Sequence, residues 1–257
     1  MRPVWSGSIG FGLVNIPVKM YTATEESTLA FVTLDKENNA RIKYKKTNAV
    51  TGQEVKEGNI IKAYEMGKDV VIMEDDDFQK AAPEKIDHLE IVQFISEKEI
   101  DAVYFEKPYY LAPDKTGGKA YNLLREALKK EGKAALGPLV YHKKEWICLI
   151  KPLDKVLVLH RIRFAQEIKG TEGLTISDQP VKTEEIKMAS MLINQLTAPF
   201  KPEKFKDEYS EKLLKVIEAK SKGKKVPGTM KVVHSASTED LMEKLKASLN
   251  AKTKKAS

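Results

Sequence analysis

The sequence predicts a mainly β protein with α, in which a closed or nearly closed β-barrel is followed by helices. Strand-like segments outnumber helical ones through residue 165, and most connections between them are short. Helical periodicity dominates only after about residue 180. This pattern of short strands favours a barrel over a doubly wound sheet. The 257 residues allow one large or two ordinary domains with a sizeable core.

The barrel is expected to begin within residues 6–23, where apolar residues alternate with small and polar ones. Gly12 separates two strands, and the glycines nearby indicate bends or close backbone approach. Pro17 cannot donate to a ladder, so it marks an edge or a bulge. A third strand is predicted over Leu29–Leu34, and Val70–Met73 is predicted to return to the core as a strand.

Residues 35–66 are too polar to form a hydrophobic core of their own and are interpreted as an extended excursion from the barrel. Within them, Arg41–Lys46 holds four cations in six residues and no acid. As a strand, it would place Arg41, Lys43 and Lys45 on one face, along roughly 13 Å. Duplex DNA carries about eight phosphates over that length. The alternative is a charged sheet edge, which lysines protect from aggregation.

The next segments alternate between helix and strand signals. Glu74-Asp75-Asp76-Asp77 is interpreted as a helix start, because acids there complement the helix dipole, with a metal cluster as the alternative. An amphipathic helix over Lys119–Glu131 ends at Gly132. The preceding Thr116-Gly117-Gly118 resembles a phosphate loop only superficially, since Ala120 replaces the hydroxyl that binds magnesium. Further strands are expected over Leu89–Ile95, Tyr104–Leu111, Ala134–His142, Glu145–Lys151 and Lys155–Arg163.

Two helices are predicted after the barrel, one from a Thr183 cap to about Ala198, where Pro199 ends it, and one over about Asp207–Lys220. Each carries an apolar stripe that needs another surface, which a second subunit could supply. The candidate dimer-interface residues are Ile186, Ile193, Leu196, Tyr209, Leu213 and Ile217.

A short third helix is expected from Ser237 or Thr238 to about Leu249. Eleven or so residues make a marginal helix in water, so its apolar stripe is typical of a motif that docks on a partner. Packing on the chain's own barrel is the alternative. The stripe consists of Leu241, Met242, Leu245 and Leu249.

The net charge of +7 lies at the C-terminal end. Residues 201–257 contain 15 lysines and 8 acidic residues, whereas the first 200 residues contain 29 of each sign. This asymmetry indicates a polyanionic partner, nucleic acid before membrane, because the basic part lacks aromatic anchors. The sequence has no apolar run near the ~20 residues of a membrane span and no signal-peptide pattern at its start.

Catalytic patterns are missing from the sequence. The four histidines lie far apart, and none has a partner at metal-ligand spacing. The lone Cys148 lies in an apolar run, where a small buried hydrophobe is expected and a nucleophile is not. A single cysteine also fits a reducing compartment. We therefore predict a cytoplasmic, nucleoid-associated protein that is no enzyme and needs no metal or cofactor.

Several long motifs in the sequence are highly specific. They are WSGSIGFGLVNIPVK at residues 5–19, ARIKYK at 40–45, APEK at 82–85, YFEKPYYLAP at 104–113, KAYNLLREAL at 119–128, and Glu208-Tyr209. Together these motifs resemble one family, the bacterial Ku proteins that bind DNA ends in non-homologous end joining. The likeness runs in order, without large gaps, from about residue 3 to about residue 220, and it resumes around Leu241–Leu249.

The resemblance implies a homodimer whose barrels and bridging arms form a ring that threads onto broken duplex DNA without reading its sequence. The bridge would be residues 35–66 within a core of residues 1–180, and residues 181–222 would be the arm that wraps the other subunit. Residues 223–257 would be a flexible basic segment whose helix, residues 238–250, recruits ligase D. The candidate DNA-binding residues are Arg41, Lys43, Lys45, Lys46, Lys62, Lys222, Lys224 and Lys225.

Two departures from the family pattern matter. Several relatives carry cysteine pairs in the bridge, suggestive of zinc, but this chain has none there, so no metal is predicted. Some relatives end in long lysine-rich extensions, whereas this chain stops soon after Lys252, Lys254 and Lys255, which argues against strong DNA binding by the tail. The competing hypotheses are a general basic scaffold, for which DNA ends would be irrelevant, and an enzyme acting on nucleic acid.

Overall fold

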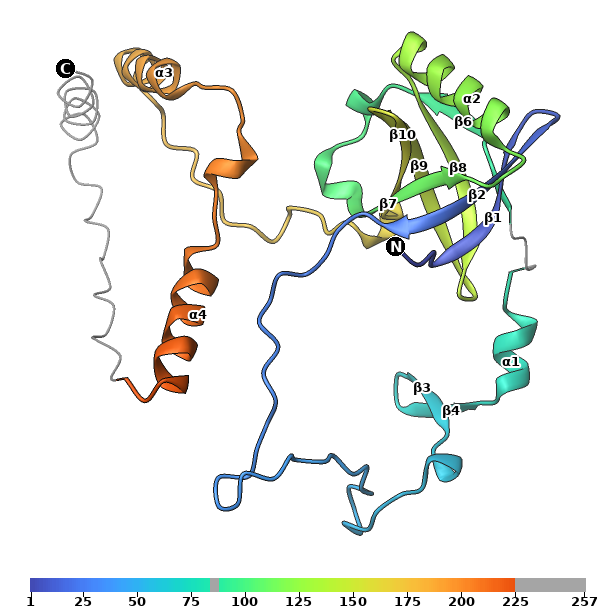
Figure 1. Ribbon diagram of the computed structural model, residues 1–257, viewed down its shortest axis with the longest axis vertical. Coiled ribbons are helices and arrows are strands. Elements are labelled where there is room, and N and C mark those ends of the chain that lie inside the picture. Colours follow the sequence, from blue (N-terminus) through green and yellow to red (C-terminus); the bar gives the residue numbers. More distant parts are fainter. Residues whose placement is uncertain (84–87, 225–257) are drawn as a thin grey trace. The chain divides into compact units, whose positions relative to one another are not determined.

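The computed structural model describes residues 1–83 and 88–224. The chain forms two compact units, Met1–Thr171 and a second that begins at Glu172. The first contains an eight-stranded sheet in the order β5-β1-β2-β7-β10-β9-β8-β6 (Figure 1). Its strands are β1 (Trp5–Phe11), β2 (Val14–Thr22), β5 (His88–Glu90), β6 (Gln93–Ile95), β7 (Phe105–Pro113), β8 (Ala134–Tyr141), β9 (Lys144–Leu153) and β10 (Val156–Ile162). The predicted mainly β, barrel-like fold is confirmed.

One short segment joins the two edges of this sheet. Strand β5 pairs in parallel with β1. After the two residues 91 and 92, β6 pairs antiparallel with β8. Between them, the Ile91 amide donates to Gly10 O (3.0 Å) in β1 and the Val92 amide donates to Leu136 O (2.9 Å) in β8. The single strand predicted over Leu89–Ile95 is therefore two strands, because the chain changes its pairing partner between residues 91 and 92.

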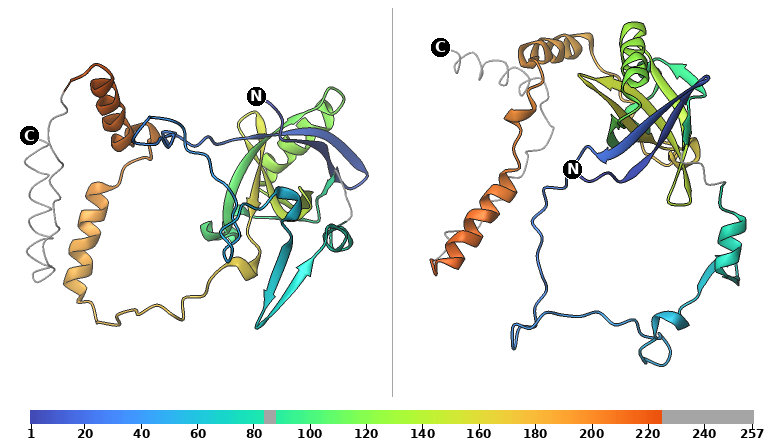
Figure 2. Two further views of the ribbon diagram at one scale, coloured as in Figure 1. Left: turned by 90° about the horizontal axis from the view of Figure 1, so that it is seen from below. Right: turned by 45° about the vertical axis from the view of Figure 1, so that its right-hand side comes forward.

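A helix completes the barrel core. Helix α2 (Gly118–Glu131) packs against β2 and β9 (Figures 1 and 2). Its residues Tyr121, Leu124 and Leu128 are buried in the same cluster as the barrel interior. The Tyr121 hydroxyl donates to Leu111 O of β7 and accepts from the Leu157 amide of β10, both at 2.6 Å. The predicted helix and its glycine stop are confirmed, since Gly132 ends it with φ of 60°.

The predicted hairpins of the barrel are also confirmed. Gly12, with φ of 59°, turns β1 into β2, and β8, β9 and β10 form the expected antiparallel meander. Cys148 of β9 is fully buried in the core, as its apolar neighbours predicted. Single-turn 3-10 helices between and after the later strands of the barrel are Glu97–Glu99, Ala102–Tyr104 and Ala165–Glu167.

Residues 24–83 form a long excursion between β2 and the segment that closes the barrel, and none of their side chains is buried (Figure 1). The excursion holds a 3-10 turn (Glu57–Asn59), β3 (Lys62–Met66), β4 (Asp69–Met73) and α1 (Asp75–Lys80). Strands β3 and β4 pair only with each other. The prediction that Val70–Met73 returns to the core is therefore wrong, although the segment is a strand.

Two local predictions in this excursion have opposite outcomes. The helix start at Glu74 is confirmed, because the Glu74 amide donates to Asp77 Oδ2 (3.0 Å) in a capping box. The strand predicted over Leu29–Leu34 is wrong, because only Leu34 is paired, in an isolated bridge with Arg41. Apolar alternation alone does not make a strand when no neighbouring strand accepts its backbone hydrogen bonds.

The second unit contains α3 (Thr183–Leu196), a 3-10 turn (Pro202–Lys204) and α4 (Glu208–Ser221). Helix α3 begins one residue earlier than predicted, because Lys182, and not Thr183, is the cap and Thr183 is the first helical residue. It ends at Leu196, two residues short of the prediction, since a residue before proline is disfavoured in helical conformation. Helix α4 lies within one residue of the predicted Asp207–Lys220 at each end, and Asp207 caps it by accepting from the Ser210 amide (3.1 Å).

Two further expectations concern helices. The third helix predicted after residue 237, with Leu241, Met242, Leu245 and Leu249, lies outside the described residues. No helix within residues 1–83 and 88–224 has the length and apolar character needed to span a bilayer.

Candidate nucleic-acid interface

The basic segment Arg41–Lys46 is not the strand that its alternation predicted. Only its first residue is paired, in the isolated bridge with Leu34, and a second isolated bridge joins Thr47 to Glu54 just beyond its end. Each bridge closes a tight turn, one before the segment and one after it. The residues between Arg41 and Thr47 pair with no neighbouring strand among the described residues. The strand prediction is therefore wrong.

The second of these turns brings acids to two of the cations. The Asn48 amide donates to Gln53 O (2.9 Å), and Gly52 adopts φ of 68°, a conformation that glycine permits in a tight turn. The reversal places Glu54 Oε2 2.6 Å from Lys45 Nζ and Glu57 Oε1 2.9 Å from Lys46 Nζ. The sequence analysis found no acid within the hexapeptide and missed these partners. The turn signal could have revealed them, because a reversal there pairs residue 47 with residue 54.

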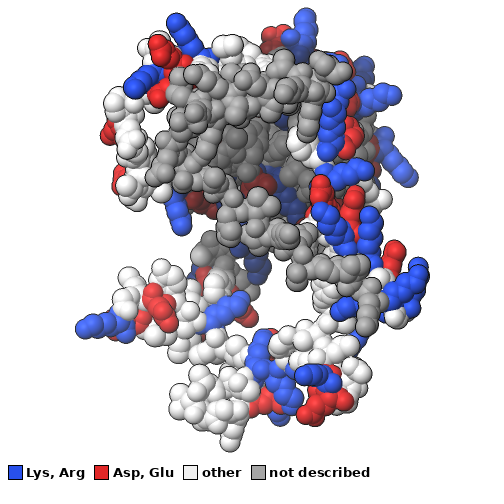
Figure 3. All heavy atoms as spheres, turned by 90° about the vertical axis from the view of Figure 1, so that its left-hand side faces the viewer, with Lys and Arg blue, Asp and Glu red and all other residues white. Residues whose placement is uncertain are grey.

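The other candidate cations of the excursion form no ion pair within residues 1–83 and 88–224. Arg41 and Lys43 are exposed and have no ion-pair partner among the described residues. Lys62 Nζ lies 5.0 Å from the centre of the Phe78 ring, a cation–π contact that keeps the positive charge. On the face in Figure 3, basic and acidic side chains lie next to one another in several places. The candidate cations therefore divide into paired and unpaired ones.

The candidate lysines at the C-terminal end follow α4. Lys222 is the residue that ends the helix, and Lys224 follows Gly223, whose φ is 67°. Both are exposed, and neither has an ion-pair partner within the described part of the chain. Cations at this position also complement the negative end of the helix dipole. Lys225 lies outside the described residues.

The candidate interface residues of α3 and α4 are uncovered. Neither helix has a buried residue. The exposed fractions are 63% for Ile193 and 67% for Tyr209, and only Leu213 is half-buried. Fourteen-residue helices owe most of their stability to packing of an apolar face, so these faces lack a partner within the described residues. The other exposed members of the set are Ile186, Leu196 and Ile217.

The basic residues at the end of β10 serve the barrel itself. Arg161 lies 4.9 Å above the Trp146 ring, and its Nε is 3.1 Å from Glu106 Oε2. His160 packs edge-on against Phe105, and burial, followed by the nearby Lys151, lowers its pKa. The imidazole is therefore neutral at pH 7, which fits a half-buried strand end better than a phosphate contact.

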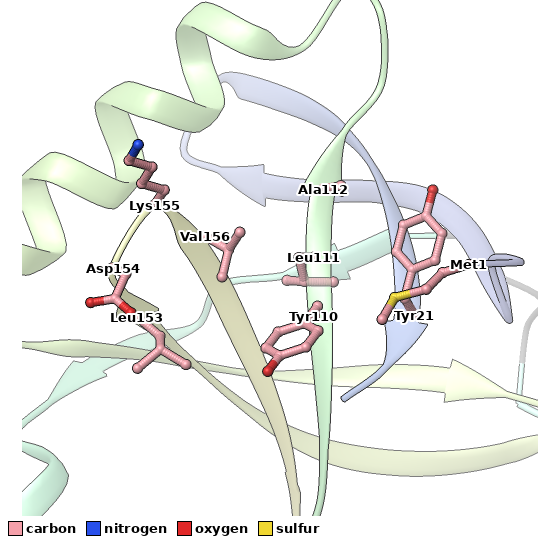
Figure 4. A pocket seen from close by; sticks show the side chains of 9 residues that line it. All are labelled: Met1, Tyr21, Tyr110, Leu111, Ala112, Leu153, Asp154, Lys155 and Val156. Atoms are coloured by element: carbon pink, nitrogen blue, oxygen red, sulfur yellow. The ribbon is translucent and has the colours of Figure 1, made fainter. Parts of the chain in front are cut away.

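An apolar pocket of about 710 Å³ lies on the sheet near the β9–β10 turn (Figure 4). Tyr110 of β7 and Val156 of β10 point into it, and Leu153 closes the side beside the turn. Tyr21 of β2 lies at the opposite side. Aliphatic and aromatic side chains line most of this pocket, so it suits an apolar side chain better than a phosphate.

The described residues offer neither a metal-ligand cluster nor a reactive cysteine. They contain no group of three or more histidine, cysteine, aspartate or glutamate side chains that could hold a metal ion. Burial raises the pKa of Cys148 to about 12, so its thiol stays protonated at neutral pH. The thiolate is the reactive form, and this cysteine is therefore inert in the folded chain.

The fold and these surfaces define a class: a β-barrel core with an inserted, exposed excursion, followed by helices whose apolar faces are uncovered. The family model described as "Ku70/Ku80 beta-barrel domain" matches residues 10–191. The chain belongs to the Ku family, as its long motifs predicted.

Similar proteins from three organisms carry the same name. The chain is 40% identical to the non-homologous end joining protein Ku of Coxiella burnetii, over 98% of this chain and 96% of that protein. It is 36% identical to the protein of that name from Archaeoglobus fulgidus, over 98% and 99% of the two chains. The corresponding protein of Desulfitobacterium hafniense is 40% identical, over 97% and 87%. The likeness therefore extends well beyond the barrel.

Proposed function

We propose that this chain is a homodimeric clamp that binds the ends of double-stranded DNA without sequence specificity and recruits ligase D in non-homologous end joining. The observation that carries the proposal is the similarity, over nearly the whole chain, to proteins named for end joining. The clamp holds DNA and leaves strand closure to the ligase, so the chain itself is no enzyme and needs no cofactor.

The exposed excursion supports a role in DNA binding. Arg41 and Lys43 present cations that no acid among the described residues neutralises. Contacts from cations to phosphates give affinity without sequence information, because base edges carry the sequence. Lys62 adds a cation from β3, and Lys222, Lys224 and Lys225 add a second basic group after α4.

Uncovered apolar surface supports the dimer. The stripes of α3 and α4 have no buried residue, and the apolar side chains of β3 and β4 are exposed as well. Exposed apolar area on this scale is typical of protein interfaces. In the proposed dimer, residues 1–180 are the core, the arm of residues 181–222 covers the partner's barrel, and the pocket in Figure 4 receives apolar side chains from that arm.

The end-binding proposal is tested with one DNA sequence in two forms. The chain should bind a linear duplex and exclude the same sequence as a closed circle, with affinity that falls steeply as salt rises. Sedimentation with and without blunt duplex should give a dimer in both cases. Equal affinity for circle and linear DNA would instead identify a general basic scaffold.

Ligase recruitment is tested separately, through the stripe of residues 238–250. Leu245→Asp should abolish stimulation of ligase D while DNA binding stays at the wild-type level, because a charge cannot enter an apolar docking groove. Leu241, Met242 and Leu249 should behave alike. Loss of both activities would show that the segment belongs to the core.

A further inference from the structure

A second pocket, of about 500 Å³, lies beside the start of β1 and the turn between β8 and β9. Trp5 and Tyr141 supply aromatic wall, and His142 and Lys143 supply nitrogen donors at its edge. None of the lining residues among residues 1–83 and 88–224 is acidic. The remaining lining residues are Val4, Gln79, Ala82, Pro83 and Val140.

Trp5, one of the lining residues, carries a donor without a partner in the described part of the chain. Its Nε1–H is buried and has no hydrogen-bond partner among the described residues. Buried indole N–H groups usually find an acceptor, since a donor stripped of water and left unpaired is unfavourable. An acceptor on a bound molecule would relieve that penalty.

Tyr141 is held in a fixed orientation. Its ring centre lies 4.5 Å from that of Trp146 and 4.2 Å from that of His142. Its hydroxyl donates to Val4 O (3.4 Å), at the other side of the pocket. Aromatic side chains fixed in this way offer a stacking surface at little further cost in conformational entropy.

The turn that carries His142 and Lys143 has an unfavourable backbone conformation. His142 and Lys143 both have positive φ, 50° and 62°, in a two-residue hairpin loop closed by Tyr141 and Lys144. Such loops favour asparagine and glycine, because other side chains are disfavoured in the left-handed region. Strained residues of this kind cluster at ligand sites.

We propose that this pocket binds an unpaired nucleotide. The base packs against Trp5 and Tyr141, and an acceptor atom of the base receives a hydrogen bond from the indole N–H. Lys143 and His142 lie toward the phosphate. Aromatic surface beside cations is how proteins bind single strands without strict sequence preference. The inference rests on the proposed DNA-end function, since a broken end with a single-stranded extension supplies such a nucleotide.

The test compares two labelled duplexes, one blunt and one carrying a short single-stranded extension, with the full chain. The wild-type protein should bind the extended end more tightly. Tyr141→Ala should weaken binding to the extended end about tenfold, the loss typical of one base–aromatic stack. Trp5→Phe, which keeps a ring and removes the N–H, should weaken it about fivefold. Neither change should alter binding to the blunt end.

Adjacent lysines provide the matched control. Lys143 lines the pocket and Lys144 does not, so Lys143→Gln should weaken binding to the extended end while Lys144→Gln should not. Thermal melting checks that each variant is folded. Unchanged affinity in the pocket variants, or equal loss on blunt and extended ends, would overturn the proposal.

A nucleotide titration separates this proposal from the end-binding one. Deoxynucleoside monophosphates should quench the protein's tryptophan fluorescence, less so in Tyr141→Ala, whether or not the chain prefers DNA ends. Absence of quenching in the wild-type protein would sink the pocket proposal alone. Quenching reversed by an acidic peptide but not by single-stranded DNA would assign the pocket to a protein partner and overturn it too.

Discussion

The division of the bridge cations into unpaired and paired ones predicts how the salt dependence of DNA binding responds to mutation. Arg41 and Lys43 have no acidic partner among the described residues, whereas Lys45 and Lys46 are paired with Glu54 and Glu57. Each cation that displaces a counterion from duplex DNA contributes about 0.9 to the slope of log affinity against log salt. Replacing the unpaired pair with alanine should therefore flatten the slope by about 1.8 per protomer, or about 3.6 per dimer.

This slope change corresponds to a large difference in measured affinity. Over a rise in salt from about 50 to about 200 mM, the wild-type protein should lose about 150-fold more affinity than the Arg41→Ala, Lys43→Ala variant. Fluorescence anisotropy with a labelled blunt duplex, repeated at several salt concentrations, measures both slopes. The control is Lys45→Ala with Lys46→Ala, which removes the same formal charge.

The control variant should change the slope far less, because each of its lysines must leave a carboxylate before it contacts a phosphate. In the opposite direction, Glu54→Gln with Glu57→Gln should steepen the slope by freeing both lysines. An equal loss of slope in the unpaired-cation variant (Arg41→Ala, Lys43→Ala) and in the control variant (Lys45→Ala, Lys46→Ala) would refute the argument from local pairing. An unchanged slope in both would show that the bridge does not touch phosphate.

Three further predictions concern stability and assembly. Tyr121→Phe should lower the free energy of unfolding in urea by about 1–3 kcal/mol, because the buried Leu157 amide loses its acceptor. Ile193→Asp should dissociate the proposed dimer in sedimentation, weakening it by at least about 3 kcal/mol because both copies carry the change. Since burial raises the pKa of Cys148 from 9.0 to about 12, the unfolded state loses this proton first, and stability should fall between those pH values by about 1.4 kcal/mol per pH unit.

Matched changes separate these effects from general damage. Tyr44→Phe removes a hydroxyl from a side chain that is 87% exposed and should leave stability unchanged. Gln195→Asp places the same charge about 200° around α3 from Ile193 and should leave the dimer intact. Cys148→Ala should show a shallower loss of stability above pH 9.0 than the wild-type protein, while the buried tyrosines contribute equally to both. A dimer that survives Ile193→Asp would exclude this stripe from the interface.

Local patterns predicted most of the barrel. Alternation with a glycine turn predicted β1 and β2, and 3.6-residue periodicity ending at Gly132 predicted α2. The same periodicity predicted α3 and α4 to within two residues at each end. These elements follow from sequence because the hydrogen bonds and side-chain spacing that define them join residues close together along the chain.

The errors share one physical cause. Leu29–Leu34 and Arg41–Lys46 have the alternation of strands, but a strand also needs a neighbour to pair with, and no local pattern reveals whether one is present. The segment Leu89–Ile95 was predicted as one strand for the same reason. Its switch from β1 to β8 depends on partners roughly 80 residues before it and 45 residues after it in the chain.

By itself, the sequence determined the type of most elements, the C-terminal excess of charge and, through its long motifs, membership of the Ku family. Only the tertiary structure decided which cations keep their charge unpaired and how β5 and β6 join the barrel edges. It alone also brought Trp5 to the β8–β9 turn, more than 130 residues away in the chain. Electrostatic pairing and desolvation act through space, so contacts between distant segments set them and residue order does not.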